Sequence, residues 1–397
     1  MSASSIKRLF EGRGTYARAR LRLGILGVTA YTGVVAVALA LGLPHRLFGT
    51  AGGSLTDDAS LLALWLLGVS VVLLPLEYLG GVHLPRAHGR KHHGLGDWIL
   101  AWLKGSLTLL VTLSFAGALV VLAGRFGGRF GAVGMFGLLA AALIAAQEWL
   151  ALLVGDLRRS RVGLEALEEE VQRHGLVMPK VRVLESNDEA FTGGITGLPT
   201  AERSIIPLAW VGRLEPAELG VLLARRITIV DRGLRALGLA AALGWVLVTF
   251  ALSTALPGAG VATVAGLLQT SLWFTLLQAL GLLVLPTPSR AATRAADAWC
   301  LEGSDTSRAD LDAALVALDE LGDRELDREP FVERWFHPVA SVASRRSALE
   351  DPKRETAPWH VARAAVYLAL VGLSPLARLV HGSVGRPDVW VLLPTDG

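Results

Sequence analysis

Six apolar runs, each close to the length of a membrane-crossing helix, dominate the pattern of the chain. They cover roughly residues 23–43, 60–80, 106–124, 131–155, 233–256 and 261–286. A helix needs about 20 apolar residues to cross the hydrocarbon core of a bilayer. The turn sequence Leu-Pro-Gly-Ala-Gly separates the last two runs. The pattern predicts a multi-pass α-helical membrane protein with about six spans.

The Lys and Arg residues of the connecting segments indicate how these spans are oriented. Basic clusters precede the first run, separate the second from the third, and follow the fourth and the sixth. Short cytoplasmic loops carry an excess of Lys and Arg. If six spans alternate, all these clusters lie on one side, and the turn at 125–130 is the exception. We therefore expect an integral protein of the inner or plasma membrane with both termini cytoplasmic.

Two polar regions interrupt this pattern and predict a cytoplasmic α+β part that is mostly helical. In the first, residues 164–175 and 215–227 have the periodicity of helices, and residues 180–186 and 203–211 are rich in β-branched side chains, as strands are. The second contains a helical pattern at 310–321 and an apolar stretch at 364–376 that is short for a span. We interpret that stretch as a docked or interfacial helix, with a seventh crossing as the alternative. The predicted parts are 1–155 (basic segment and four spans), 156–232 (cytoplasmic), 233–286 (two spans) and 287–397 (cytoplasmic).

Composition agrees with a membrane protein and excludes some functions. The chain has 397 residues, of which 52% are hydrophobic and 18% are charged, with a net charge of +3. Soluble domains average about 25% charged residues. There is no concentrated basic and aromatic surface of the kind that binds nucleic acid, so the bilayer is the first expected partner. Cys300 is the single cysteine, which excludes an intramolecular disulfide and a Cys-based zinc site.

Five segments carry recognisable motifs in a fixed order and spacing. They are 76–110 (a Gly-rich turn and loop), 175–194 (a strand and an Asn-Ala-Phe-x-x-Gly-like turn), 213–226 (Leu-x-x-x-Glu-Leu), 289–303 (a helix with Ala-Asp) and 336–350 (His-Pro and Arg-x-x-Ala-Leu). In this order and spacing they resemble the membrane zinc metallopeptidases of the HtpX and CAAX prenyl protease type I group, peptidase family M-48, and the resemblance touches most of the chain. The resemblance implies a metallopeptidase-like domain with a bound zinc ion.

The residues that would hold this zinc are missing. The family's His-Glu-x-x-His motif, in which two histidines bind zinc and the glutamate activates water, falls on Arg225, Arg226 and Ile229. The third ligand, a glutamate four residues before the aspartate of the Ala-Asp pair, falls on Thr293, with Asp297 as that aspartate. Arginine has no lone pair for a metal, and isoleucine has no donor atom. We therefore expect no catalytic residues, no metal and no cofactor at this site.

Other histidines offer a weaker alternative. His88 and His92 lie one helical turn apart in the segment His-Gly-Arg-Lys-His-His at 88–93, but no acid lies between them, and a solvated loop is the favoured interpretation. His337 matches a family position outside the primary ligands, where a packed histidine is the commoner case. An active metalloendopeptidase with ligands relocated to these histidines is the second hypothesis. A structural or transport membrane subunit is the third.

The two arginines suggest a substitute for the lost metal charge. If Asp297 has lost a metal site beside it, it needs a new cationic partner, and we hypothesise that Arg225 or Arg226 reaches it. With His337, these residues form the candidate polar cluster. Adjacent helical residues cannot face the same way, so we expect one arginine to point to water or phosphate. The alternative is that both extend to the headgroup region, because the next apolar run begins at about residue 233.

Acids within the apolar runs also call for an explanation, and the missing chemistry favours a binding function. Glu77 lies near the end of its run, close enough to extend to the membrane surface, and Glu148 is expected to hydrogen-bond between helices. The first hypothesis is a catalytically inactive metallopeptidase-like membrane protein that binds a polypeptide or membrane-protein partner. Such proteases hold extended peptides along a sheet edge, and we place that edge at 203–211.

Overall fold

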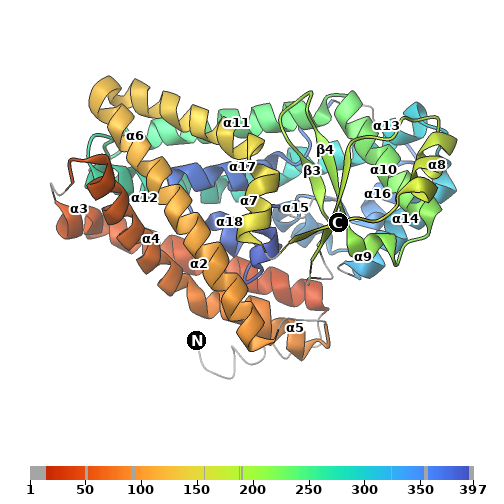
Figure 1. Cartoon of the computed structure of the whole chain (residues 1–397), viewed down its shortest axis with the longest axis horizontal. Helices are drawn as coiled ribbons and strands as arrows, with labels where there is room; N and C mark the ends of the chain where they lie inside the picture. Colours follow the sequence, from red (N-terminus) through yellow and green to blue (C-terminus); the bar gives the residue numbers. More distant parts are fainter. Residues whose placement is uncertain are drawn as a thin grey trace.

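Long apolar helices form one end of the molecule (Figure 1). The computed structural model describes residues 15–49, 52–90, 94–155, 157–186, 188, 191–322, 324–352 and 356–392. In this part of the chain, five helices are long and apolar enough to cross a membrane. They are α2 (Tyr16–Ala40), α4 (Leu55–Tyr78), which continues through η1 (Leu79–His83) and α5 (Leu84–Ala87), α6 (Leu95–Ala145), α11 (Leu234–Ser253) and α12 (Val264–Val284).

The six apolar runs of the sequence are found in these five helices because α6 contains two of them. Within its 51 residues, Gly128 has a φ of 57° and a ψ of −147°, so the helix is kinked there. Glycine adopts a positive φ without the steric cost that a Cβ imposes. The arms before and after Gly128 correspond to the third and fourth predicted runs, and the short α7 (Gln147–Val154) extends the second arm. The connection after α2 holds α3 (Leu43–Phe48).

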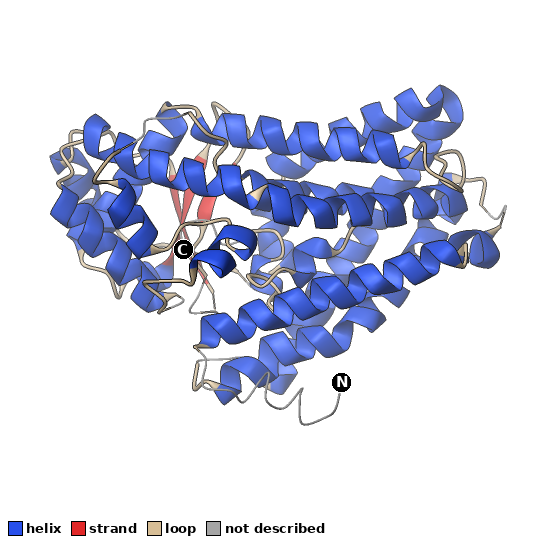
Figure 2. Cartoon of the chain, turned by 180° about the vertical axis from the view of Figure 1, so that it is seen from behind, coloured by secondary structure: helices blue, strands red, loops and turns tan. Residues whose placement is uncertain are grey.

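A four-stranded sheet lies at the other end, surrounded by shorter helices (Figure 2). Its order is β1 (Arg158–Ser160), β2 (Val181–Glu185), β4 (Arg203–Pro207), β3 (Gly194–Thr196). The central β2–β4 pair is parallel, and the two outer pairs are antiparallel. Both predicted strands are present, although residues 208–211 form α9 (Leu208–Val211) instead of extending the second one.

The prediction that residues 203–211 form an edge of the sheet was wrong. The Gly-rich segment between the two predicted strands supplies β3, which pairs with β4 and covers it. Gly193 makes this possible, because its φ is +66° and a Cβ at this position would lie 2.0 Å from the carbonyl oxygen of Ile205. Only a residue without a side chain allows the two backbones to approach this closely. The two edge strands of the sheet are therefore β3 and β1.

The helices beside the sheet share a separate apolar core. α10 (Pro216–Asp231) packs against α8 (Glu165–Arg173), α13 (Pro286–Gly303) and α14 (Arg308–Leu321). A capping box of Glu215 and Glu218 fixes the start of α10, as the acidic first turn predicted. The remaining helices of this end are α15 (Pro330–Phe336) and α16 (Val342–Ala348). The core residues include Leu167, Val171, Leu219, Leu222, Leu315 and Leu318.

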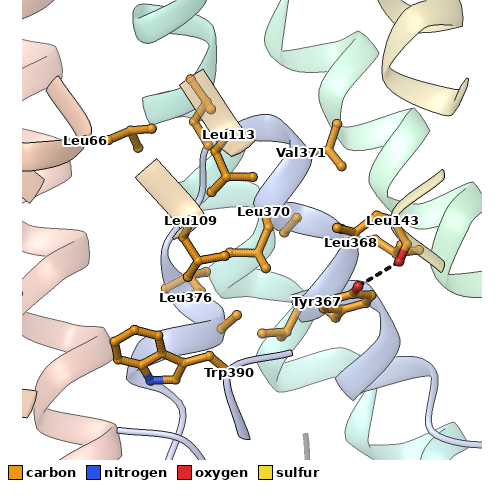
Figure 3. Packing of buried hydrophobic residues seen from close by; sticks show 14 of the residues in the cluster. Leu66, Leu109, Leu113, Leu143, Tyr367, Leu368, Leu370, Val371, Leu376 and Trp390 are labelled. Carbon is orange, nitrogen blue, oxygen red and sulfur yellow. Dashed lines mark hydrogen bonds between the residues drawn. The ribbon is translucent and has the colours of Figure 1, made fainter. Parts of the chain in front are cut away.

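The C-terminal segment returns into the bundle of long helices. It comprises α17 (Val361–Leu368), η2 (Ala369–Gly372), α18 (Leu376–Leu379) and η3 (Pro387–Val389). Figure 3 shows its Leu370, Leu376 and Trp390 near Leu109 of α6, and the Tyr367 hydroxyl donates to the Leu143 carbonyl at 2.8 Å. The apolar stretch at 364–376 is therefore docked, as one interpretation predicted, but inside the bundle and not at its surface. Residues 361–392, at the end of the predicted part 287–397, share the core of the long helices.

A buried ion pair holds this segment in place. The Arg378 guanidinium donates from Nε and Nη2 to the two carboxylate oxygens of Glu77, each at 2.8 Å, and Trp102 Nε1 donates to Glu77 at 2.5 Å. Arg378 also stacks on Trp390. The prediction that Glu77 extends to the membrane surface was wrong, because its carboxylate is fully buried against Arg378. Glu148 differs too: its partners are arginines of the sheet and not of another apolar helix.

Candidate functional site

The contact between α10 and α13 contains three of the four degenerate motif positions, Arg225, Ile229 and Thr293. Arg225 and Ile229 lie one turn apart on α10, and Thr293 and Asp297 lie one turn apart on α13. Ile229 packs in one buried apolar cluster with alanines of α13, and Arg225 Nη2 lies 3.5 Å from the Thr293 carbonyl oxygen. The spacing of the sequence resemblance therefore corresponds to a real juxtaposition of side chains in the fold.

The centre of this juxtaposition is the carboxylate of Asp297, which binds two guanidinium groups. Arg225 Nε donates to Asp297 Oδ1 at 2.6 Å. Arg345, from α16, donates Nε to Oδ2 at 2.6 Å and Nη2 to Oδ1 at 2.7 Å. All three side chains are at most 2% exposed. Charge-assisted and bidentate hydrogen bonds of this kind are the strong ones, so the Arg225–Asp297–Arg345 network ties three helices together.

The network is electrostatically consistent with an ionised carboxylate. Burial by itself raises the pKa of Asp297, but the charges and hydrogen bonds of Arg345 and Arg225 outweigh it and lower that pKa. One turn further along α13, burial raises the pKa of the Cys300 thiol, which is fully buried. A thiol in this state is a poor nucleophile.

Arg226 serves a different neighbour. It donates from Nη1 to the Ile205 carbonyl at 2.7 Å and from Nη2 to the Thr192 carbonyl at 2.9 Å, and its guanidinium lies 5.2 Å from the centre of the Trp210 ring. Successive helical residues point about 100° apart. Arg225 thus faces α13 while Arg226 faces the sheet. The expectation that one arginine points to water or phosphate was wrong, because both are 2% exposed and the sheet supplies the acceptors.

These residues do not fit zinc, the metal that the sequence resemblance implies. A catalytic zinc site needs about three nitrogen, sulfur or carboxylate ligands and an open position. Arg225 and Ile229 have no such donor, and the Thr293 hydroxyl donates to the Ser289 carbonyl at 3.0 Å. Asp297, the one carboxylate of the set, is occupied by guanidinium groups. Across the described residues, no group of three or more His, Cys, Asp or Glu side chains could hold a metal ion.

The histidines lie elsewhere. The contacts of His337 are with Arg290, which donates to its carbonyl oxygen at 2.8 Å, and with the ring of His381 at 5.2 Å, and not with Asp297. Burial and neighbouring cations hold the pKa of His337 well below its ordinary value, so the ring is neutral. His88 donates to the Leu84 carbonyl. His92 and His93 lie outside the described residues.

Arg345 is the member of the network that the sequence prediction missed. It lies 48 residues after Asp297 and one residue before Arg346, which pairs with the exposed Asp312. A signal was nevertheless present, because Arg345 is the arginine of the Arg-x-x-Ala-Leu segment that carries part of the family resemblance. Of the two adjacent arginines, Arg345, which matches the family segment, is buried, and Arg346 is exposed.

The long apolar helices and the helix-and-sheet end define an integral membrane protein. Its fold is similar to that in the crystal structure of Ste24p from S. mikatae, with a TM-score of 0.66 and 16% sequence identity over 84% of this chain and 87% of that chain. No protein-family model matches the sequence, and no curated protein matches it. At this identity the match establishes the fold, which is the fold expected from the resemblance to the CAAX prenyl protease group.

Proposed function

We propose that this chain is a catalytically inactive membrane protein of metallopeptidase-like fold that binds a polypeptide or membrane-protein partner. The observation that carries the proposal is the saturation of Asp297 by Arg225 and Arg345. The degenerate motif positions contain no metal donor set, and the space between α10 and α13 is filled by an ion network. Catalysis by zinc-activated water has no residues to act through here.

The arginines give the network a structural role in this proposal. Two guanidinium groups carry the same total charge as one divalent zinc ion. They connect α10, α13 and α16, which lie far apart in the sequence. A buried acid left without a partner would be strongly unfavourable, so the pair of arginines keeps the helix arrangement that a metal would otherwise fix.

The proposed partner site lies at β1. The two edge strands of the sheet are β3 and β1, and because β3 is buried along its whole length, β1 is the better position for an added peptide strand. Arg158 and Arg159 of β1 are exposed. Their charge favours an acidic extended segment of the partner.

Metal content and hydrolysis test the inactive state. The full-length protein, purified in mild detergent, is analysed for bound metal and for cleavage of a quenched fluorescent peptide library with zinc added. The control variant Arg225→His, Arg226→Glu, Ile229→His, Thr293→Glu restores the family's donor set. We expect no stoichiometric zinc in the natural chain. About one tightly held zinc per chain, with hydrolysis that a chelator abolishes, would overturn the proposal and favour relocated ligands.

Partner binding needs its own test. A photo-crosslinker placed at β1 in native membranes should capture a polypeptide, and the variant Arg158→Glu, Arg159→Glu should lose that product. Arg173→Glu, an exposed position on α8, is the matched control and should retain it. Equal capture by both variants would contradict binding at β1, and facilitated uptake of a solute by reconstituted vesicles would favour a transport subunit instead.

A further inference from the structure

A cavity of about 560 Å³ lies between α2, α12 and the C-terminal segment. Most of its lining is aliphatic. Thr32, Trp273 and Leu256 lie at one end, and Pro338, Arg363 and His381 lie at the other. This volume is within the range of about 300–1,000 Å³ that small-molecule sites occupy. The cavity is separate from the Arg225–Asp297–Arg345 network.

The length and the opening of the cavity match one leaflet of a bilayer. Its lining on α2 runs from Leu21 to Thr32, and the eleven helical steps between them, at 1.5 Å each, span roughly 16 Å. The hydrocarbon core of a bilayer is about 30 Å thick, so one leaflet is about half of that. The lining residues Leu280 and Leu283 of α12 are exposed on the outer surface of the helix bundle. The cavity is therefore a groove that opens toward lipid.

The polar end of the groove carries positive charge. Arg363 and His381 line it directly, and Arg20 donates from Nε to the His381 carbonyl at 3.1 Å. Two more arginines approach from behind, because Arg290 donates to the carbonyl of His337 and Arg328 to that of Val339. Among the described acids, Glu325 pairs with Arg18 and with Arg328, and Glu333 accepts from the Ser341 backbone, so the described cations still outnumber the acids at this end.

One buried polar atom at this end lacks a partner. His337 lies between the lining residues Phe336 and Pro338, is 4% exposed, and packs its ring against that of His381. Its Nε2 makes no hydrogen bond. Buried polar groups are ordinarily satisfied. An acceptor or donor supplied by a ligand at the polar end would complete this ring.

We propose that the groove binds one anionic phospholipid, with an acyl chain along α2 and α12 and the phosphate beside Arg363, His381 and His337. The cationic end lies where α12 meets α13 at Pro286, the level at which the chain leaves the apolar helices. A headgroup at this level and an acyl chain reaching one leaflet deep fit both ends at once. The site does not depend on the proposed loss of peptidase activity.

Native mass spectrometry of the full-length protein tests the site. The protein is extracted from nanodiscs that contain phosphatidylglycerol and phosphatidylcholine in equal amounts, and the retained lipids are counted. We expect one phosphatidylglycerol per chain. Arg363→Gln should reduce the preference for phosphatidylglycerol about fivefold, the effect of one cation on an anionic headgroup. Arg363→Lys should keep most of the preference.

A groove-filling variant separates binding from general lipid contact. Ala279→Trp fills the groove from α12 and should abolish the retained lipid, whereas Val111→Trp, at an exposed position on α6 outside the groove, should not. Equal retention of the two phospholipids by the natural chain would overturn the proposal. So would unchanged retention in Ala279→Trp, or replacement of the phospholipid by a free fatty acid.

Discussion

Removal of the Asp297 carboxylate should cost more stability than removal of the whole Arg225–Asp297–Arg345 network. In Asp297→Ala, two guanidinium groups stay buried within one small volume without their shared anion. Breaking a buried ion pair by deleting one partner costs about 3–5 kcal/mol, and replacing the whole pair by apolar residues of similar size is often neutral or better. The variant Arg225→Met, Asp297→Leu, Arg345→Met should therefore be more stable than Asp297→Ala.

Unfolding in lipid nanodiscs, followed by tryptophan fluorescence, measures this difference. Because membrane proteins often unfold irreversibly, rates at one temperature are compared. The exposed Arg346–Asp312 pair joins the neighbouring helices α14 and α16 and is the matched control. Asp312→Ala should change stability by less than about 1 kcal/mol, since exposed pairs contribute little.

The double-mutant cycle gives the result that would refute the reasoning. Asp297→Ala is compared with Arg225→Ala and with the double variant Arg225→Ala, Asp297→Ala. Residues in direct contact show coupling, while independent sites add. If the two single losses simply sum in the double variant, the Arg225–Asp297 contact contributes nothing and the network does not hold α10 against α13.

Three further predictions concern buried charged groups: Asp297, Arg226 and the Glu77–Arg378 pair. Asp297 has a lowered pKa, so its ion pairs contribute stability above its unfolded pKa near 3.8, and this contribution is lost as pH falls through the folded pKa. The stability advantage of the natural chain over Asp297→Asn should therefore shrink below about pH 4. A constant difference from pH 7 to pH 2 would contradict this. Arg226→Met should destabilise the protein by about 2–4 kcal/mol, since two buried carbonyls lose their charged donor. Arg226→Lys should not restore the natural stability, because an ammonium lacks the planar fork of a guanidinium. Full rescue by lysine in thermal unfolding would refute the two-carbonyl geometry. Glu77→Gln should destabilise the protein by about 3–5 kcal/mol, and adding Arg378→Met should recover part of that loss. The rate of proteolysis of the C-terminal segment measures the loss of its anchoring. Equal protection in all variants would show that the Glu77–Arg378 pair does not anchor this segment.

Local pattern predicted the helices and the central strands well because each of them is encoded in adjacent residues. Apolar runs of near-span length, β-branched strands and the acidic first turn of α10 need no partner to be recognised. The resemblance aligned Arg225 and Ile229 with Thr293 and Asp297, and the fold brings α10 against α13.

The errors concern contacts between residues far apart in the chain. Glu77 was expected at the membrane surface because its partner Arg378 is 301 residues away. The sequence predicted that the stretch at 364–376 is docked, but not that residues 361–392 return into the bundle, because their partners in the long helices are far away in the chain. β3 was not predicted because glycine is disfavoured in strands, and its pairing with β4 depends on a close approach that only the fold reveals.

The two adjacent arginines have different roles because the helix separates their directions. Arginine is always charged and must find acceptors when it is buried. Arg226 donates to two backbone carbonyls, that of Ile205 in β4 and that of Thr192 just before β3. Arg225 donates to Asp297, whose second cation is Arg345. Two guanidinium groups can therefore be buried between α10 and α16 because the acid Asp297 lies between them and accepts hydrogen bonds from both.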